Sequence, residues 1–149
     1  MRRDLSVPVA AADLPPGVAL VPFSNALAPA CRNLLNSAYA DGFGDVVPFD
    51  QWWPALTGDS EYDPALCFVA SAGAQIIGFC QCWTSSFVKD IATDRAWHRQ
   101  GIATALLTAA MCEFRRRGAP AIDLKTDVDN VAAQAAYLRL GFTIVDRIG

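Results

Sequence analysis

The stretch from Asp90 to Phe142 constrains the fold most strongly. It predicts a strand, a glycine turn, a long helix, a second strand and a second helix in succession. The first joint reads His98-Arg99-Gln100-Gly101-Ile102-Ala103. At such a joint the free backbone N–H groups and the positive end of the helix dipole converge, which makes a binding site for an anion. Arg95 and Arg99 add positive charge beside the turn, so we expect it to bind a diphosphate.

The glycine turn is not specific by itself. It lacks the G-x-G-x-x-G spacing of a dinucleotide site and the lysine of a P-loop, and a glycine can serve only to permit a tight turn. The second joint adds detail, because Asn130 can cap a helix and Gly141 can supply the left-handed residue that ends it. A strand is expected over Phe142–Asp146. Between Asn130 and Gly141, apolar residues recur at helical spacing at Ala133, Ala136, Tyr137 and Leu140.

In this order, the two joints resemble the GCN5-related N-acetyltransferase (GNAT) superfamily, over about Phe87 to Asp146. The resemblance implies an α/β (α+β) fold with a central mixed, mostly antiparallel sheet flanked by helices. It also implies acetyl-CoA as cosubstrate, without a metal, and direct attack of an amine on the thioester. The acceptor is expected to be a primary amine of a small molecule or a peptide. The alternatives are a non-catalytic acyl-CoA-binding domain of the same fold and a nucleotide-binding module.

The resemblance assigns the pantetheine arm of the cofactor to the strand before the turn, and the diphosphate to the turn itself. One residue departs from the family pattern, since His98 stands where Gln or Arg is usual. An imidazole can still donate a hydrogen bond but is mostly neutral at pH 7. The implied cofactor-binding residues are Ile91, Ala92, Thr93, His98, Arg99, Gln100, Gly101, Ile102, Ala103, Thr104, Asn130, Ala133 and Tyr137.

Two residues are candidates for proton transfer. Tyr137 matches the tyrosine that in the family protonates the departing thiolate. A tyrosine on an amphipathic helix is otherwise more often a packing residue. Asp90 is the nearest carboxylate on the cofactor strand and our candidate base. Its alternatives are a strand aspartate paired with Lys89 or an arginine, and a water relay that makes a base unnecessary.

Trp52, Trp53 and Trp83 are candidates for the wall of an acceptor site, with core packing as the rival role for each. No lysine or arginine occurs from residue 33 to residue 88, where six acids fall, whereas the segment from Arg95 to Arg117 is basic. This distribution favours a cationic acceptor. The run Arg115-Arg116-Arg117 could hold a phosphate of the cofactor, but three cations at a helix C-terminus are expected to complement its dipole. The six acids are Asp41, Asp45, Asp50, Asp59, Glu61 and Asp63.

Composition excludes several other classes. A chain of 149 residues with 53% hydrophobic residues fits one domain, 1–149, in which 1–16 are expected to form a loose leader. A net charge of −3 without a basic stripe gives no case for nucleic-acid binding. Five cysteines without C-x-x-C suggest reduced thiols in a cytoplasmic setting, and a single histidine argues against a metal cluster. No targeting segment is recognised.

The uncharged run from residue 64 to 88 is long enough to span a membrane. Polar residues and a turn at Ala72-Gly73-Ala74 interrupt it, so a pair of strands is expected instead and no membrane contact. Family members commonly add one more strand after Phe142–Asp146. Without that strand, Phe142–Asp146 would have an open edge. We therefore expect the edge to be covered by a second subunit or by the N-terminal leader, and we favour the homodimer. The remaining predicted strands are Val18–Phe23, Leu66–Ala70, Gln75–Trp83, Phe87–Thr93 and Ala121–Thr126, and the remaining helices Asn25–Ala40, Pro48–Leu56 and Ile102–Arg117.

Overall fold

A six-stranded sheet in the order β1-β6-β5-β4-β3-β2 organises the computed structural model, which describes residues 1–40, 42, 44–127 and 129–145. Only β5 and β6 pair in parallel, and the other neighbours are antiparallel, so the predicted mixed, mostly antiparallel sheet is confirmed. The strands are β1 Arg2–Asp4, β2 Val18–Pro22, β3 Cys67–Ala72, β4 Gln75–Trp83, β5 Phe87–Thr93 and β6 Ala121–Leu124.

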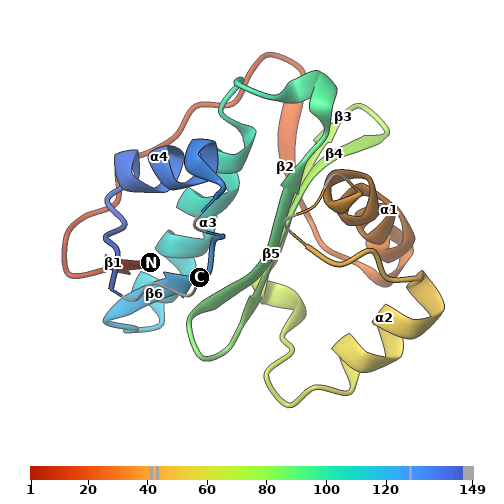
Figure 1. Cartoon of the computed structure of the whole chain (residues 1–149), viewed down its shortest axis with the longest axis horizontal. Helices are drawn as coiled ribbons and strands as arrows, with labels where there is room; N and C mark the ends of the chain where they lie inside the picture. The colour runs from red at the N-terminus through yellow and green to blue at the C-terminus, as the bar shows by residue number, and fades with distance from the viewer. Residues whose placement is uncertain (41, 43, 128, 146–149) are drawn as a thin grey trace.

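Helices cover both faces of the sheet (Figure 1). One face packs against α1 and α2, and the other against α3 and α4. Three short 3-10 turns, η1, η2 and η3, lie at Asn25–Leu27, Pro64–Leu66 and Arg95–Trp97. Among the described residues, no helix has the length and apolar character to cross a membrane. The helices are α1 Ala28–Tyr39, α2 Phe49–Thr57, α3 Ile102–Arg116 and α4 Val131–Arg139.

The uncharged run from residue 64 to 88 contains the two predicted strands, β3 and β4. The run carries no charge because both faces of β4 are buried. Phe79 faces the core under α1 and α2, whereas Ile77 and Cys80 face the core under α3. Gly78 is needed between them, since a Cβ there would lie 2.8 Å from Ile102 Cγ2 and would push away the first turn of α3. The predicted anion turn is therefore seated directly on the sheet.

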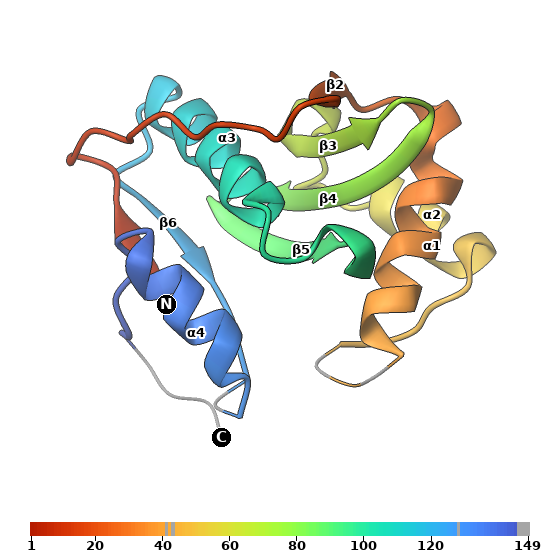
Figure 2. The ribbon, with the colours of Figure 1, turned by 90° about the horizontal axis from the view of Figure 1, so that it is seen from above.

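A β-bulge interrupts the pairing of β5 with β4. Gln81 of β4 pairs with Asp90 and Cys82 with Val88, so that Lys89 has no partner on β4. The parallel pairing with β6 involves only Phe87 and Val88, and beyond them the two strands diverge (Figure 2). The edge of β5 that faced β6 is therefore unpaired with β6 from Lys89 to Thr93.

The expectation of a loose leader over 1–16 is wrong for its first residues. Arg2–Asp4 form β1, an edge strand antiparallel to β6, and both Met1 and Leu5 are buried. The following segment runs past α3 on its way to β2 (Figure 2), where Val9 and Leu14 pack against the core. The apolar residues between the prolines have no periodic pattern in the sequence, so these two contacts with the core could not be predicted.

Other differences concern the ends of elements. The helix expected from Asn25 begins as the 3-10 turn η1, because Pro29 occupies the first turn of α1. The strand expected over Phe142–Asp146 is reduced to a single bridge between Arg2 and Thr143, and Asp146 lies outside the described residues. The strand expected over Ala121–Thr126 is shorter in the structure, where β6 ends at Leu124.

Candidate active site

A cleft with a volume of about 1630 Å³ opens where β5 and β6 diverge, and it continues from the α1–α2 side to the α3–α4 side. It brings together most of the residues that the sequence indicated. It does not include Gln100 or Trp53, so neither of these two predicted site residues lines it. The predicted residues in its walls are Trp52, Trp83, Asp90, Ile91, Ala92, Thr93, His98, Arg99, Gly101, Ile102, Ala103, Thr104, Asn130, Ala133 and Tyr137.

The turn before α3 has the backbone of an anion site. Gly101 is the N-cap of α3 with φ of 80°, and Arg99 adopts φ of 64°, a conformation rare for a residue with a side chain. Such left-handed residues turn successive N–H groups toward one side, next to the positive end of the helix. The unfavourable backbone conformation of Arg99 therefore lies at the place where binding of an anion by these N–H groups would offset its cost.

His98 does not extend freely from this turn. Its Nε2 lies 3.1 Å from the backbone oxygen of Thr93, so the ring connects the loop back to the end of β5. The sequence had suggested a hydrogen bond from His98 to a phosphate oxygen. With Nε2 engaged in this way, His98 stabilises the loop, and Arg99 is the cationic residue of the turn that lines the cleft.

One residue of the cleft wall, Thr93, has a hydroxyl group without a hydrogen-bond partner among the described residues. The oxygen of this hydroxyl, Oγ1, is buried. Buried hydroxyls are normally paired, so an unpaired one in a cleft wall suits a ligand with its own polar groups. The edge of β5 from Asp90 to Thr93 adds backbone groups unpaired with β6, which an amide-bearing ligand could bind as a strand does.

The helix α4 closes the cleft. Asn130 caps it as predicted, by accepting a hydrogen bond from the backbone N–H of Ala133 at 3.3 Å, and Gly141 with φ of 95° ends it. The predicted apolar stripe is only half-buried, because Ala133, Ala136 and Tyr137 line the cleft, although Tyr137 also packs against the core. The stripe therefore belongs to the ligand site as much as to the core.

Tyr137 is a protonated phenol in an apolar wall. Its ring packs against Phe142 with the centroids 6.0 Å apart. Burial, and next the nearby Cys80 thiol, raise the pKa of Tyr137 to about 12. At neutral pH the hydroxyl therefore carries its proton and can donate it to an anion formed in the cleft.

Asp90 lies on the opposite side of β5, next to α1. Its Oδ1 accepts a hydrogen bond of 2.8 Å from the hydroxyl of Tyr39 at the end of α1. Among the described residues it makes no ion pair within 4.0 Å, so the alternative pairing with Lys89 is not formed. Tyr39 lines the cleft and was missed by the sequence analysis, because nothing in its helix pattern indicates a contact with a residue 51 positions away.

The aromatic wall on the α2 side involves two of the three predicted tryptophans. Trp52 is nearly buried but reaches the cleft, with the guanidinium of Arg32 5.4 Å from the centre of its ring. Trp83 lies at the end of β4. Trp53 instead stacks on Phe49 with centroids 6.0 Å apart, and thus has the rival role of a packing residue.

The arginines at the end of α3 are engaged elsewhere. Arg116 and Arg117 bind the carboxylate of Glu113, Arg117 also binds Asp63 at 3.0 Å, and Arg115 donates to the backbone oxygen of Leu5. None of the three lines the cleft, and their place at the C-terminal end of α3 is the one where cations complement a helix dipole.

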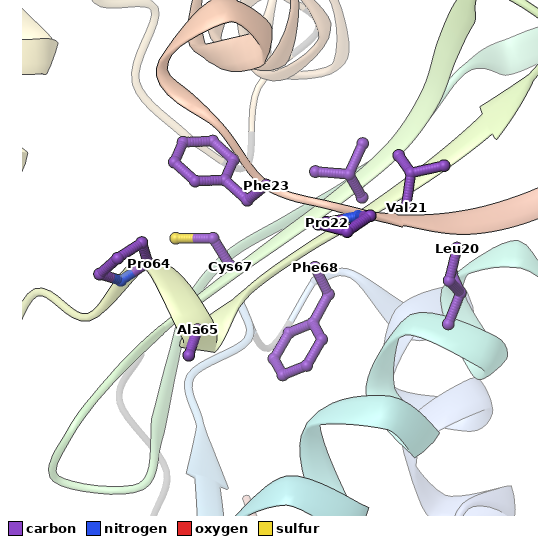
Figure 3. Close-up of a pocket in the computed structure, with 9 residues that line it drawn as sticks. Leu20, Val21, Pro22, Phe23, Pro64, Ala65, Cys67 and Phe68 are labelled. Atoms are coloured by element: carbon purple, nitrogen blue, oxygen red, sulfur yellow. The ribbon is translucent and has the colours of Figure 1, made fainter.

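A second, smaller cavity of about 350 Å³ lies beside the edge strand β2 (Figure 3). Its walls are apolar, with side chains such as Phe23, Pro64 and Phe68, and its one titratable group is the thiol of Cys67. Burial raises the pKa of that thiol far above its usual value, so it stays neutral. Asp90 and Tyr137, the candidates for proton transfer, both line the larger cleft and not this cavity.

Comparison with known proteins agrees with this geometry. The profile of the Acetyltransferase (GNAT) family matches residues 28–142. N-alpha-acetyltransferase 30 of Schizosaccharomyces pombe is 34% identical over 57% of this chain and 62% of its own length. Mycothiol acetyltransferase of Thermobispora bispora is 28% identical over 96% of this chain and 52% of its own length. The chain thus spans between half and two thirds of these relatives.

Solved structures of other proteins share the fold. A GCN5-related N-acetyltransferase from Sphaerobacter thermophilus superposes with a TM-score of 0.78 and 23% identity, over 94% of this chain and 45% of that one. The enzyme AAC(6')-Iy, solved with a CoA-containing bisubstrate analogue, gives a TM-score of 0.72 and 16% identity over 89% of this chain and 95% of that one.

Proposed function

Because this chain belongs to the GNAT acetyltransferase family, we propose that it transfers an acetyl group from acetyl-CoA to a primary amine of a small molecule or peptide. One observation carries the proposal. A single cleft joins the positive-φ turn at Gly101, the diverging edge of β5 and the phenol of Tyr137. These are an anion site, a strand-like site for amides and a proton donor, which are the three groups that an acyl-CoA thioester requires.

The residues present fit the cofactor. The N–H groups around Arg99 and Gly101 and the start of α3 would hold the diphosphate. The backbone of Ile91 and Ala92 would pair with the pantetheine amides, and the unsatisfied hydroxyl of Thr93 would gain a polar partner. Acetyl-CoA supplies the activated acyl group when bound, and the chain supplies orientation and proton transfer.

Two residues of the chain would handle the protons. Asp90 accepts a proton from the acceptor's ammonium group, which leaves a neutral amine. The amine nitrogen forms a bond to the acyl carbon, and the carbon–sulfur bond breaks. Tyr137 donates its proton to the departing sulfur and regains one from the nitrogen. The products are an amide and the free thiol of CoA, with one proton released overall.

The carboxylates on one side of the cleft support a cationic acceptor. The side that carries Asp90 also presents Asp45 and Asp59, together with the aromatic surfaces of Trp52 and Trp83. Carboxylates at a cleft mouth attract a cation and repel acidic ligands, and the tryptophans can pack against an apolar group beside the amine. We therefore propose an amine on a partly apolar carrier as the acceptor.

A thiol-release assay over a panel of primary amines tests this function, with mass spectrometry to locate the new acetyl group. We expect acetyl-CoA to be consumed only with an amine present, and the acetyl group to be found on nitrogen. An acyl-CoA-binding domain without turnover would bind the cofactor but release no thiol beyond spontaneous hydrolysis with any amine.

A further inference from the structure

We propose that Tyr39 is a positioning residue that aims the carboxylate of Asp90 at the acceptor amine, and that the segment after α1 holds Tyr39 in place. The inference rests on the proposed function, since it concerns the base of that reaction. It adds a residue that no sequence motif indicated. Three sets of contacts carry it, from the segment 44–48 through Tyr39 to Asp90.

The first set clamps the segment onto α1. Asn36 uses its whole amide, donating from Nδ2 to the backbone oxygen of Val47 at 2.8 Å and accepting at Oδ1 from the backbone N–H of Val47 at 2.9 Å. Arg32 donates to the same Oδ1 and to the backbone oxygen of Asp45 at 3.1 Å. Arg32 is only 2% exposed, so these bonds lie in a largely dry environment where they are strong.

The second contact is between Gly44, at the start of this segment, and the aromatic ring of Tyr39. A Cβ added to Gly44 would lie 2.5 Å from two ring carbons of Tyr39, so the glycine backbone rests directly on the phenol. Any side chain at this position must displace the ring. Gly44 has no positive φ, so the requirement for glycine here comes from space and not from backbone conformation.

The third contact is the hydrogen bond from the Tyr39 hydroxyl to Asp90 Oδ1 at 2.8 Å. Burial first, and then the charge of Asp90, raise the pKa of Tyr39 far above its usual value, so the hydroxyl remains a donor and cannot replace Asp90 as the base. With Oδ1 held, Oδ2 is the oxygen available to the acceptor. The bond fixes the side-chain rotamer of a residue that sits beside the bulge of β5, where the strand gives it less support.

Tyr39→Phe tests the proposal, because it removes the hydroxyl and keeps the ring. We expect kcat/KM for the amine to fall about 10-fold or more, as for the loss of a hydrogen bond to a charged group, with the KM for acetyl-CoA unchanged. Tyr62→Phe is the matched control. Tyr62 packs its ring on Trp53 and does not line the cleft, so kcat/KM should not change.

Two further variants separate positioning from a purely structural role. In an Asp90→Asn background, Tyr39→Phe should cause no further loss, since both changes act through one carboxylate. Gly44→Ala should lower kcat/KM for the amine in the same direction as Tyr39→Phe, although it removes no polar group.

The outcomes distinguish this inference from the proposed function. If the wild-type protein acetylates no amine, the proposed function fails. If it is active, and Tyr39→Phe and Gly44→Ala both retain wild-type kcat/KM, the inference is wrong while the function stands. Losses that multiply in the Tyr39→Phe, Asp90→Asn double variant would also overturn it, because Tyr39 would then act independently of Asp90.

Discussion

The backbones of Arg2 and Thr143 are hydrogen-bonded in both directions, with N–O distances of 2.9 Å from Arg2 N and 2.7 Å from Thr143 N. On its other side Arg2 pairs with Asp123 of β6. The first strand of the chain therefore lies between β6 and the segment that follows α4. The edge expected to need a second subunit or the leader is covered at Thr143 by the leader.

The buried Arg3 is predicted to be the key residue of this arrangement. Its guanidinium donates to the backbone oxygens of Leu140, Val7 and Pro8 at 3.2, 2.9 and 3.2 Å, and also to that of Asp4. Arg3→Ala leaves these carbonyls without their donor, so we expect the free energy of unfolding to fall by about 2–3 kcal/mol in urea titrations.

Arg2→Ala is the control for this experiment, because Arg2 is an exposed neighbour whose side chain pairs with Asp123 at 2.7 Å. Exposed ion pairs contribute little, so the urea midpoint should hardly move. If neither variant lowers the free energy of unfolding, the strand is held by its backbone alone.

Tyr137→Phe should lower kcat by roughly 10² or more and leave the affinity for acetyl-CoA nearly unchanged, because the ring and its packing remain while the proton donor is lost. Steady-state kinetics and calorimetry on the same preparation measure both quantities. Because burial raises the pKa of Tyr137 to about 12, ionisation of this donor should not lower kcat between about pH 7 and pH 10. An unaltered kcat would make Tyr137 a packing residue.

Gly101→Val should abolish binding of CoA. A β-branched residue is strained at φ of 80°, and its side chain would occupy the space through which the backbone approaches a diphosphate. A Cβ here meets nothing closer than the backbone oxygen of Asp13 at 3.9 Å, so crowding within the protein is not the cause. His98→Arg is the companion variant and should preserve or tighten binding in calorimetry. If it weakens binding several-fold, the bond from His98 to the backbone oxygen of Thr93 matters more to this turn than an added cation does.

Cationic amines should be better acceptors than matched anionic amines, and the advantage should shrink as salt is added. Asp45, Asp59 and Asp90 all line the acceptor side, and screening by salt weakens their long-range attraction. Values of kcat/KM for paired acceptors at low and high ionic strength measure the effect. Equal values for both charges at all salt concentrations would contradict the proposed role of these acids.

The sequence predicted the elements whose signals are local. The bounds of β4 and β5 are those predicted, because turn residues and uncharged runs mark both ends. The cap at Asn130 and the left-handed Gly141 also follow from residues near one another in the chain. These elements carry most of the cofactor side of the cleft.

Contacts between distant segments could not be predicted in this way. The pairing of Arg2 with Thr143 and the bond from Tyr39 to Asp90 join residues far apart in the chain, with no periodic pattern at either end. Trp52 and Trp53 are adjacent and chemically identical, so only the orientation of α2 decides which of them reaches the cleft. The residues on the acceptor side of the cleft could therefore be identified only from the structure.

Calorimetric titration of the wild-type protein with acetyl-CoA, CoA, ATP and NAD tests most directly whether the cleft between β5 and β6 is an acetyl-CoA site. Acetyl-CoA and CoA should bind at a single site, because of the four ligands only these two join a diphosphate, for the Gly101 turn, to a pantetheine arm whose two amides can pair with the edge of β5. ATP and NAD should bind far more weakly or not at all. Binding of ATP or NAD in preference to CoA would contradict the account.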